Sequence, residues 1–222
     1  MSSKATDVQS EIQKTEPSRR GILYVVSAPS GGGKGTLIRR VLDVMPDLSY
    51  SVSYTTRAPR NGEVNGREYF FVDRDEFEKM ETAGEFLEWA NVHGHLYGTS
   101  RKQVTEEIAS GTDIILEVDV QGASSVRSLG LDSVSVFILP PSLETLRSRL
   151  ILRGTDSSEQ LAVRLRKAPE ELSQYATFDY VIFNDEVDRA AKQLAAIVLA
   201  ERARRARQEP LVRDVIEKFK SD

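Results

Sequence analysis

A glycine-rich loop containing one lysine lies between an apolar run and a helical pattern. Residues 22–26 are apolar and lead into Ser27-Ala28-Pro29-Ser30-Gly31-Gly32-Gly33-Lys34-Gly35-Thr36. Glycines let successive backbone N–H groups point at an anion, the following helix N-terminus adds partial positive charge, and Lys34 adds a full charge. The segment predicts a phosphate-binding loop. The alternative is an ordinary glycine-rich turn before a helix.

Two positions of this loop depart from the pattern G-x-x-x-x-G-K-[ST]. Ala28 replaces the first glycine, and Gly35 stands where a hydroxyl often ligates magnesium, with Thr36 one residue later. The first departure leaves the phosphate cradle intact, whereas the second argues against direct metal ligation by the loop. We therefore expect Mg²⁺ to be held mainly by phosphate oxygens and water, with Thr36, Glu117 or Asp119 as protein partners.

Acidic residues follow a second apolar run. Residues 114–116 are apolar and precede Glu117-Val118-Asp119. Carboxylates at the carboxyl end of a parallel strand lie where ligands bind in an open α/β sheet, so Glu117 and Asp119 are candidates for work near Mg²⁺ or the substrate. The alternative is two acids in a surface loop.

Two arginines three residues apart mark a second candidate anion site. Arg57 and Arg60 lie in residues 51–69, a stretch that also carries several hydroxyls and Tyr69. Guanidinium groups bind phosphate oxygens through paired hydrogen bonds, and a tyrosine hydroxyl adds another donor. The pattern suits a phosphate monoester, although charge alone favours a solvated basic loop.

An alternation of buried strands and helices is expected to position these residues. Apolar runs bounded by turn residues predict strands at 22–26, 114–118, 134–139 and 180–183. Helical spacing predicts helices at 37–45, at 101–110, from 142, at 158–175 and at 188–208. Pro169 is expected to end or kink the fourth of these helices, and Pro210 to break the last. This order predicts a parallel α/β sheet with helices on both faces.

Residues 50–100 interrupt that alternation. They are rich in Ser, Thr, Gly, Arg and Tyr and contain short alternating runs such as residues 68–72. We expect an inserted subdomain with a small sheet and one helix at 74–82. The polar and charged residues 1–20 are expected to form a flexible tail.

Composition restricts the class of protein further. The 222 residues carry a net charge of -4, 40% are hydrophobic, and none is cysteine, which excludes disulfides, zinc–cysteine sites and thiol catalysis. No apolar run is long enough for a membrane helix, and the N-terminus has no apolar signal region. The charge balance gives no argument for binding to nucleic acid or membranes. A soluble, cytoplasmic protein is expected, with its oligomeric state open.

Six motifs in order resemble those of bacterial-type guanylate kinases, over residues 21 to about 201. They are Ala28-Pro29-Ser30-Gly31 through Lys34, Thr55-Thr56-Arg57-Ala58-Pro59-Arg60-Asn61-Gly62-Glu63, Tyr97-Gly98-Thr99, Glu117-Val118-Asp119-Val120-Gln121-Gly122, Arg153-Gly154-Thr155-Asp156 and Asn184-Asp185. The resemblance implies a P-loop nucleoside monophosphate kinase fold that transfers the γ-phosphoryl of ATP to GMP with Mg²⁺.

The resemblance also implies a role for individual residues. Those expected to hold the GMP phosphate are Arg57, Arg60, Tyr69 and Tyr97, with Glu63 bracing the arginine loop. Those expected to recognise guanine are Ser53, Glu88, Thr99 and Asp119. Lys34, Arg153 and Arg164 would act on the transferring phosphoryl, with Arg149 nearby and Asn184 at the adenine end of ATP.

The implied organisation has a core at 21–52 and 100–207, a GMP-binding subdomain at 53–99 and a lid at about 150–168. Residues 208–222 would form a short C-terminal helix or tail. An acceptor phosphate is ionised at neutral pH, so this reaction needs no general base, only alignment of two anions and charge neutralisation.

Two other functions remain as alternatives. Gly35-Thr36 resembles adenylate kinases, but residues 55–60 and the pair Glu88 and Asp119 argue against another base. A non-catalytic, phosphopeptide-binding relative would not be expected to keep Lys34, Arg153 and Arg164. Three further features have simpler interpretations: Trp89 as a core residue, His93 and His95 as surface or loop residues, and residues 201–207 as a solvated helix face.

Overall fold

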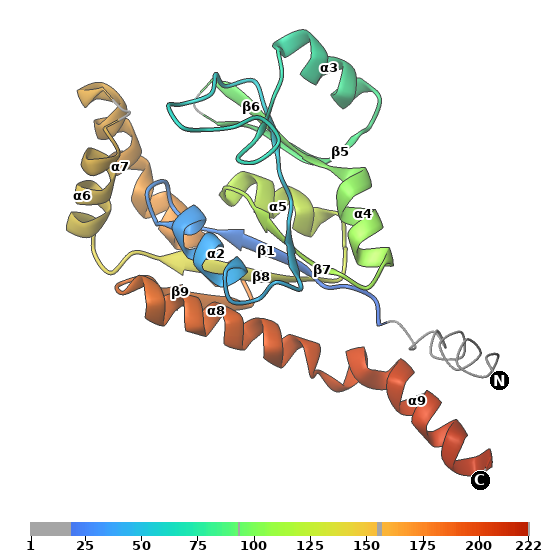
Figure 1. Cartoon of the computed structure of the whole chain (residues 1–222). Helices are drawn as coiled ribbons and strands as arrows, with labels where there is room; N and C mark the ends of the chain where they lie inside the picture. The colour runs from blue at the N-terminus through green and yellow to red at the C-terminus, as the bar shows by residue number, and fades with distance from the viewer. Residues whose placement is uncertain (1–18, 93, 155–156, 222) are drawn as a thin grey trace, which may run out of the picture.

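A five-stranded parallel sheet forms the centre of the protein in the computed structural model, which describes residues 19–92, 94–154 and 157–221 (Figure 1). Its order is β2-β7-β1-β8-β9. The strands are β1 (Leu23–Ser27), β2 (Leu48–Tyr50), β7 (Asp113–Glu117), β8 (Ser133–Leu139) and β9 (Tyr180–Phe183). Four of them match the predicted runs, and β2 was not predicted. The flexible tail proposed for residues 1–20 lies almost wholly outside the described residues.

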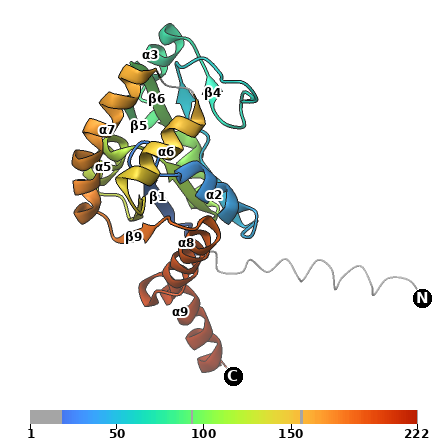
Figure 2. The same cartoon turned by 90° about the vertical axis from the view of Figure 1, so that its left-hand side faces the viewer.

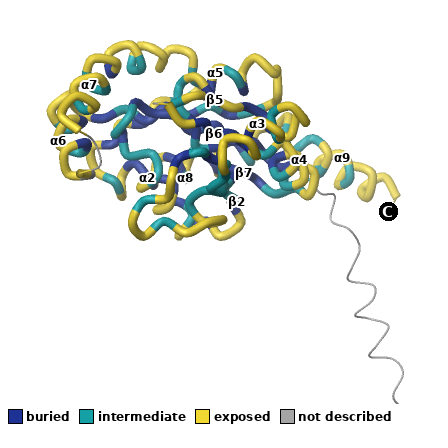
Figure 3. Tube along the Cα trace, turned by 90° about the horizontal axis from the view of Figure 1, so that it is seen from above, coloured by how far each residue is buried: buried dark blue, intermediate teal, exposed yellow. Residues whose placement is uncertain are grey.

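Alternating side chains of β1 supply two apolar cores, one on each face of the sheet. Ile22, Tyr24 and Val26 pack with α2 (Lys34–Leu42) and α8 (Val187–Arg202). Leu23 and Val25 pack with α4 (Arg101–Ala109) and α5 (Val120–Ser128). Buried residues consequently run through the middle of the molecule between exposed helix surfaces (Figure 3). The predicted parallel sheet with helices on both faces is confirmed.

Two helices beside the carboxyl ends of the strands form a small cluster of their own. They are α6 (Leu143–Arg153) and α7 (Ser158–Ser173), and they pack through Leu146, Leu150 and Ala168 (Figure 2). A single 3₁₀ turn (Gln174–Thr177) follows α7. Pro169 lies inside α7 without ending it. The helix tolerates Pro169 at the cost of the hydrogen bond that an amide there would give to the Leu165 carbonyl.

The inserted segment has a mixed four-stranded sheet with the order β4-β3-β6-β5, above the main sheet in Figure 1. Its elements are β3 (Tyr54–Thr55), β4 (Phe70–Phe71), α3 (Arg74–Thr82), β5 (Phe86–Val92) and β6 (His95–Ser100). Phe77, Phe86 and Leu96 form its core. The predicted small sheet and single helix are therefore both present.

Trp89 does not belong to that core. Its side chain is 41% exposed on β5, so the prediction of a core residue is wrong. The strand places Glu88, the neighbour of Trp89, in the interior instead. Successive side chains of a strand point to opposite faces, so burying Glu88 directs Trp89 towards solvent.

The C-terminal helix prediction is also wrong in its boundaries. Helix α8 ends at Arg202, and α9 (Arg205–Ser221) contains Pro210 rather than stopping before it. The boundary expected at residue 207 or 208 lies inside α9. Polar contacts hold the break between the helices: the Gln208 amide donates to the Arg202 carbonyl at 2.7 Å, and Arg207 pairs with Asp132 at 2.8 Å. No helix of the described residues is long and apolar enough to span a membrane.

Candidate active site

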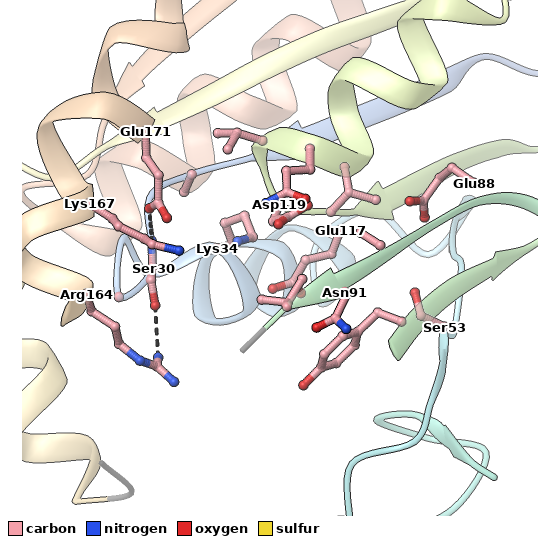
Figure 4. Close-up of a pocket in the computed structure, with 18 of the residues that line it drawn as sticks. Ser30, Lys34, Ser53, Glu88, Asn91, Glu117, Asp119, Arg164, Lys167 and Glu171 are labelled. Atoms are coloured by element: carbon pink, nitrogen blue, oxygen red, sulfur yellow. Dashed lines mark hydrogen bonds between the residues drawn. The ribbon is translucent and has the colours of Figure 1, made fainter. Parts of the chain in front are cut away.

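One cavity collects most of the predicted site residues at the carboxyl end of β1 and β7. Figure 4 shows Arg164 and Glu171 from α7 on one side of it and Ser53 and Glu88 from the inserted segment on the other. The predicted residues that line it are Ala28, Ser30, Gly31, Lys34, Ser53, Arg60, Tyr69, Glu88, Tyr97, Glu117, Asp119 and Arg164. The phosphate loop and the second anion site therefore face one shared space.

The phosphate loop connects β1 to α2 through left-handed glycines. Gly31 has φ 86° and Gly33 has φ 91°, a region that glycine adopts without strain. A Cβ atom on Gly33 would lie 2.5 Å from Nδ2 of Asn184, which donates to the Gly32 carbonyl at 2.9 Å. Arg149 reaches the same carbonyl at 3.3 Å and the Asn184 carbonyl at 2.7 Å. Arg149 and Asn184 thus support the loop from behind.

Glu117 approaches the loop where the usual hydroxyl residue is missing. A Cβ atom on Gly35 would lie 3.3 Å from Oε2 of Glu117, and Tyr50 donates a hydrogen bond to the same oxygen at 3.3 Å. Burial raises the pKa of Tyr50, and the Glu117 charge adds to that shift. Thr36 is exposed and is not one of the residues that line the cavity. Of the three residues expected as possible partners of Mg²⁺, the fold brings Glu117 and Asp119 into the cavity but not Thr36.

The arginine loop is held by one carboxylate. Arg57 is only 8% exposed, and its Nη2 donates to both Glu63 oxygens at 2.9 and 3.0 Å. Glu63 also accepts the Arg60 backbone N–H at 2.7 Å. The Arg57 guanidinium lies 5.4 Å from the centroid of the Tyr69 ring. Arg57 and Glu63 therefore shape the loop, while Arg60, Tyr69 and Tyr97 line the cavity.

A buried carboxylate lies at the far side of the cavity. Glu88 is 8% exposed and accepts a hydrogen bond from Oγ1 of the fully buried Thr99 at 2.5 Å. Burial raises the pKa of Glu88 to about 7, and the Asp119 charge adds to that effect. Asp119 itself caps α5, because its Oδ1 accepts the Gly122 N–H at 2.8 Å. This capping role of Asp119 was not predicted.

Helix α7 contributes residues that sequence reasoning missed. Lys167 and Glu171 line the cavity beside the predicted Arg164. Arg164 donates to the Ser30 hydroxyl at 2.9 Å, and Glu171 accepts the Ser30 backbone N–H at 3.0 Å. The spacing of Lys167 and Glu171 from Arg164, three and seven residues along one helix, was the sequence signal that could have identified them. Arg153 ends α6, but its side chain lies outside the described part of the structure, as does His93. His95 is exposed, as expected, and no cluster of potential metal ligands occurs among the described residues.

A phosphate loop, a facing anion site and a helix pair beside them on a parallel sheet define a P-loop nucleotide kinase. The sequence model described as guanylate kinase matches residues 20–201. The chain belongs to the guanylate kinase family.

Relatives in three bacteria support that assignment over most of the chain. The guanylate kinase of Geobacter sulfurreducens is 49% identical over 189 residues, which cover 85% of this chain and 93% of the relative. The guanylate kinase of Symbiobacterium thermophilum is 50% identical over 200 residues, or 90% and 95% of the two chains. The crystal structure of guanylate kinase from Anaplasma phagocytophilum is similar, with a TM-score of 0.73, 34% identity and coverage of 87% and 94%.

Proposed function

We propose that the chain transfers the γ-phosphoryl group of ATP to GMP, giving ADP and GDP. The observation that carries this proposal is the shared cavity, in which a phosphate loop faces a second anion site and a buried carboxylate. The proposal assigns the phosphate loop to ATP and the opposite side to GMP. ATP and GMP are then its partners, and the cytoplasm is its expected location.

The GMP side has groups that suit each part of the acceptor. Arg60, Tyr69 and Tyr97 would bind the phosphate, with Arg57 and Glu63 fixing the loop that carries Arg60. Guanine presents N1–H and an exocyclic amine side by side, and an ionised Glu88 accepts from both. The other expected base contacts are Ser53, Thr99 and Asp119, although Thr99 donates to Glu88 and Asp119 caps α5 in the absence of substrate.

The ATP side would use the loop amides and Lys34 to bind phosphate oxygens. Asn184 is expected at the adenine end and Arg149 near the transferring phosphoryl, and both side chains support the loop from behind. Oxygen ligands suit Mg²⁺, and the Glu117 carboxylate beside Gly35 fits a magnesium ion that also takes phosphate oxygens and water. Magnesium would supply additional positive charge to the phosphates.

Catalysis in this proposal is positioning and charge neutralisation. The acceptor phosphate is a ready nucleophile, so no general base is required. Lys34, Arg164 and Arg153 would stabilise the negative charge that accumulates between donor and acceptor. The lid, at about residues 150–168, and the inserted subdomain at 53–99 would close over the cavity and exclude water, which would otherwise accept the phosphoryl group.

A coupled assay for ADP release tests this function against its alternatives. ATP with GMP should give rapid ADP release, ATP with AMP should give almost none, and Lys34→Met should abolish the GMP-dependent rate. Efficient turnover of AMP would instead indicate another nucleotide kinase. Phosphopeptide binding without turnover by the folded wild-type protein would indicate a non-catalytic binding domain.

A further inference from the structure

Three charged residues of α7 form one face above the phosphate loop. Arg164, Lys167 and Glu171 are spaced three and four residues apart, which places them on the same side of a helix. All three line the cavity that contains Lys34, and Figure 4 shows them projecting from α7 towards Ser30. Arg164 has an expected role in phosphoryl transfer, whereas Glu171 has none so far.

Glu171 and Arg164 hold the same residue of the loop. Oε2 of Glu171 accepts the Ser30 backbone N–H at 3.0 Å, and Nη1 of Arg164 donates to the Ser30 hydroxyl at 2.9 Å. The two side chains start seven residues apart, which is about 10 Å along a helix. Because both side chains reach Ser30 from points so far apart on α7, they restrict the orientation of the helix as well as its distance from the loop.

Pro169 separates these two contacts along α7. Because proline has no N–H, the helix lacks its hydrogen bond to the Leu165 carbonyl between Arg164 and Glu171. Bending of a helix is concentrated at such positions. The two contacts with Ser30, one on each side of Pro169, therefore hold both halves of α7 against the same residue of the loop.

The charge of Glu171 needs an explanation as well as its hydrogen bond. A carboxylate in a cavity built for phosphates repels a bound triphosphate, so a neutral acceptor would serve better if the contact only stabilised the fold. On the side of the phosphate loop, the cavity also holds three cationic residues, Lys34, Arg164 and Lys167. An anion at position 171 draws these cations towards the phosphate loop.

We propose that Glu171 is a positioning residue for phosphoryl transfer, which attaches the C-terminal half of α7 to Ser30 and thereby sets the place of Arg164. This inference rests on the proposed kinase activity and extends it to a residue with no expected substrate contact. Glu171 acts through Ser30 and Arg164 rather than on the nucleotide itself.

Steady-state kinetics of two Glu171 variants test the proposal. Glu171→Met keeps the length of the side chain and its helix propensity but removes the strong acceptor. It should lower kcat about tenfold to hundredfold, with the KM for GMP changed less than about twofold, because the GMP site lies across the cavity. Glu171→Gln retains an acceptor for the Ser30 N–H but loses the charge, so it should recover only part of the lost kcat. Glu170→Met, at an exposed neighbouring position outside the cavity, is the matched control and should behave as wild type.

A double variant separates positioning from a purely structural contribution. If Glu171 acts through Arg164, Glu171→Met should change kcat less than about twofold once Arg164→Met is present. Multiplicative losses in the double variant would overturn the proposal. So would an unchanged kcat with tighter ATP binding in Glu171→Met, since that result would make Glu171 a competitor of the nucleotide phosphates.

A failure of the proposed kinase activity would give a different result from a failure of the role assigned to Glu171. In that case the wild-type protein itself would not phosphorylate GMP, whereas a wrong assignment of Glu171 alone leaves wild-type turnover intact. Thermal unfolding of each variant checks that the fold persists. A loss of kcat in Glu171→Met that follows only from a lower fraction of folded protein would also overturn the proposal.

Discussion

Lowering the pH should weaken GMP binding, because Glu88 must be ionised to accept hydrogen bonds from guanine N1–H and the exocyclic amine. Burial raises the pKa of Glu88 to about 7 in the protein without substrate. With that pKa, about nine-tenths of the carboxyl groups are ionised at pH 8 and about one-tenth at pH 6. The apparent affinity for GMP should therefore fall about tenfold over this range from Glu88 alone.

Glu88→Gln provides the control for other titrations. The GMP phosphate also gains a proton near pH 6, but it does so equally in wild type and variant. The ratio of the KM for GMP in the variant to that in the wild type should thus shrink by about tenfold as the pH falls from 8 to 6. Calorimetry in buffers of different ionisation enthalpy measures the number of protons released when GMP binds. At pH 7 this number should be larger by about half a proton in wild type than in Glu88→Gln.

The contribution of Glu88 to folding stability should change with pH in the opposite direction to GMP affinity. The pKa of Glu88 is raised from 4.5 to about 7, so its contribution to stability is present below about pH 4.5 and lost as the pH rises through 7. The shift corresponds to about 3 kcal/mol at most. Glu88→Gln should therefore gain stability relative to wild type between pH 5 and 8 in urea denaturation without GMP. Parallel pH profiles of GMP affinity in the two proteins would refute this reasoning.

Three further substitutions test the phosphate loop, the acceptor site and a buried ion pair. Lys34→Met should abolish turnover while leaving the unfolding transition nearly unchanged, since Lys34 lines the cavity; retention of most of the kcat would remove its role in the transition state. Arg60→Ala should raise the KM for GMP at least about tenfold and leave that for ATP alone, whereas equal effects on both would place it outside the acceptor site. Asp113→Asn should lower the free energy of unfolding by about 3 kcal/mol in chemical denaturation without altering either KM. The reason is that this fully buried carboxylate pairs with Arg19 and Arg202 far from the cavity. A loss below about 1 kcal/mol would contradict the argument from the buried ion pair.

The sequence predicted the parts of the fold in which local pattern and burial agree. The run at 22–26 became β1 because its residues alternate between two apolar cores, and Lys34 began the helix that its glycine-rich context indicates. Helix α5 was missed because residues 120–128 form a short segment with three serines and one glycine, which have weak helical propensity. What secures this helix is its Asp119 cap and the packing of Val126 against the sheet.

Contacts between distant residues explain the other misses. Pro210 looked like a helix end, yet the helices separate at residues 203–204, where Gln208 caps α8 and Arg207 reaches Asp132. Glu171 carried no sign of a site in its own neighbourhood, since its partner Ser30 is 141 residues away. Residue type and spacing alone suggested an anion site at Arg57, Arg60 and Tyr69. The resemblance to guanylate kinases was needed for the role of Glu63, because a carboxylate six positions after Arg57 has no local signature.

Two glycines leave room for two carboxylates of this site, Glu88 and Glu117. A Cβ on Gly122 would lie 2.8 Å from Oε2 of Glu88, and a Cβ on Gly35 would lie 3.3 Å from Oε2 of Glu117. A side chain at position 122 would require the Glu88 carboxylate to move, because 2.8 Å is too short for a contact with a Cβ atom. At position 35 the missing side chain leaves room beside the loop for the Glu117 carboxylate of β7. A side chain at position 35 would require the Glu117 carboxylate to shift by a few tenths of an ångström, so these two positions are structurally coupled.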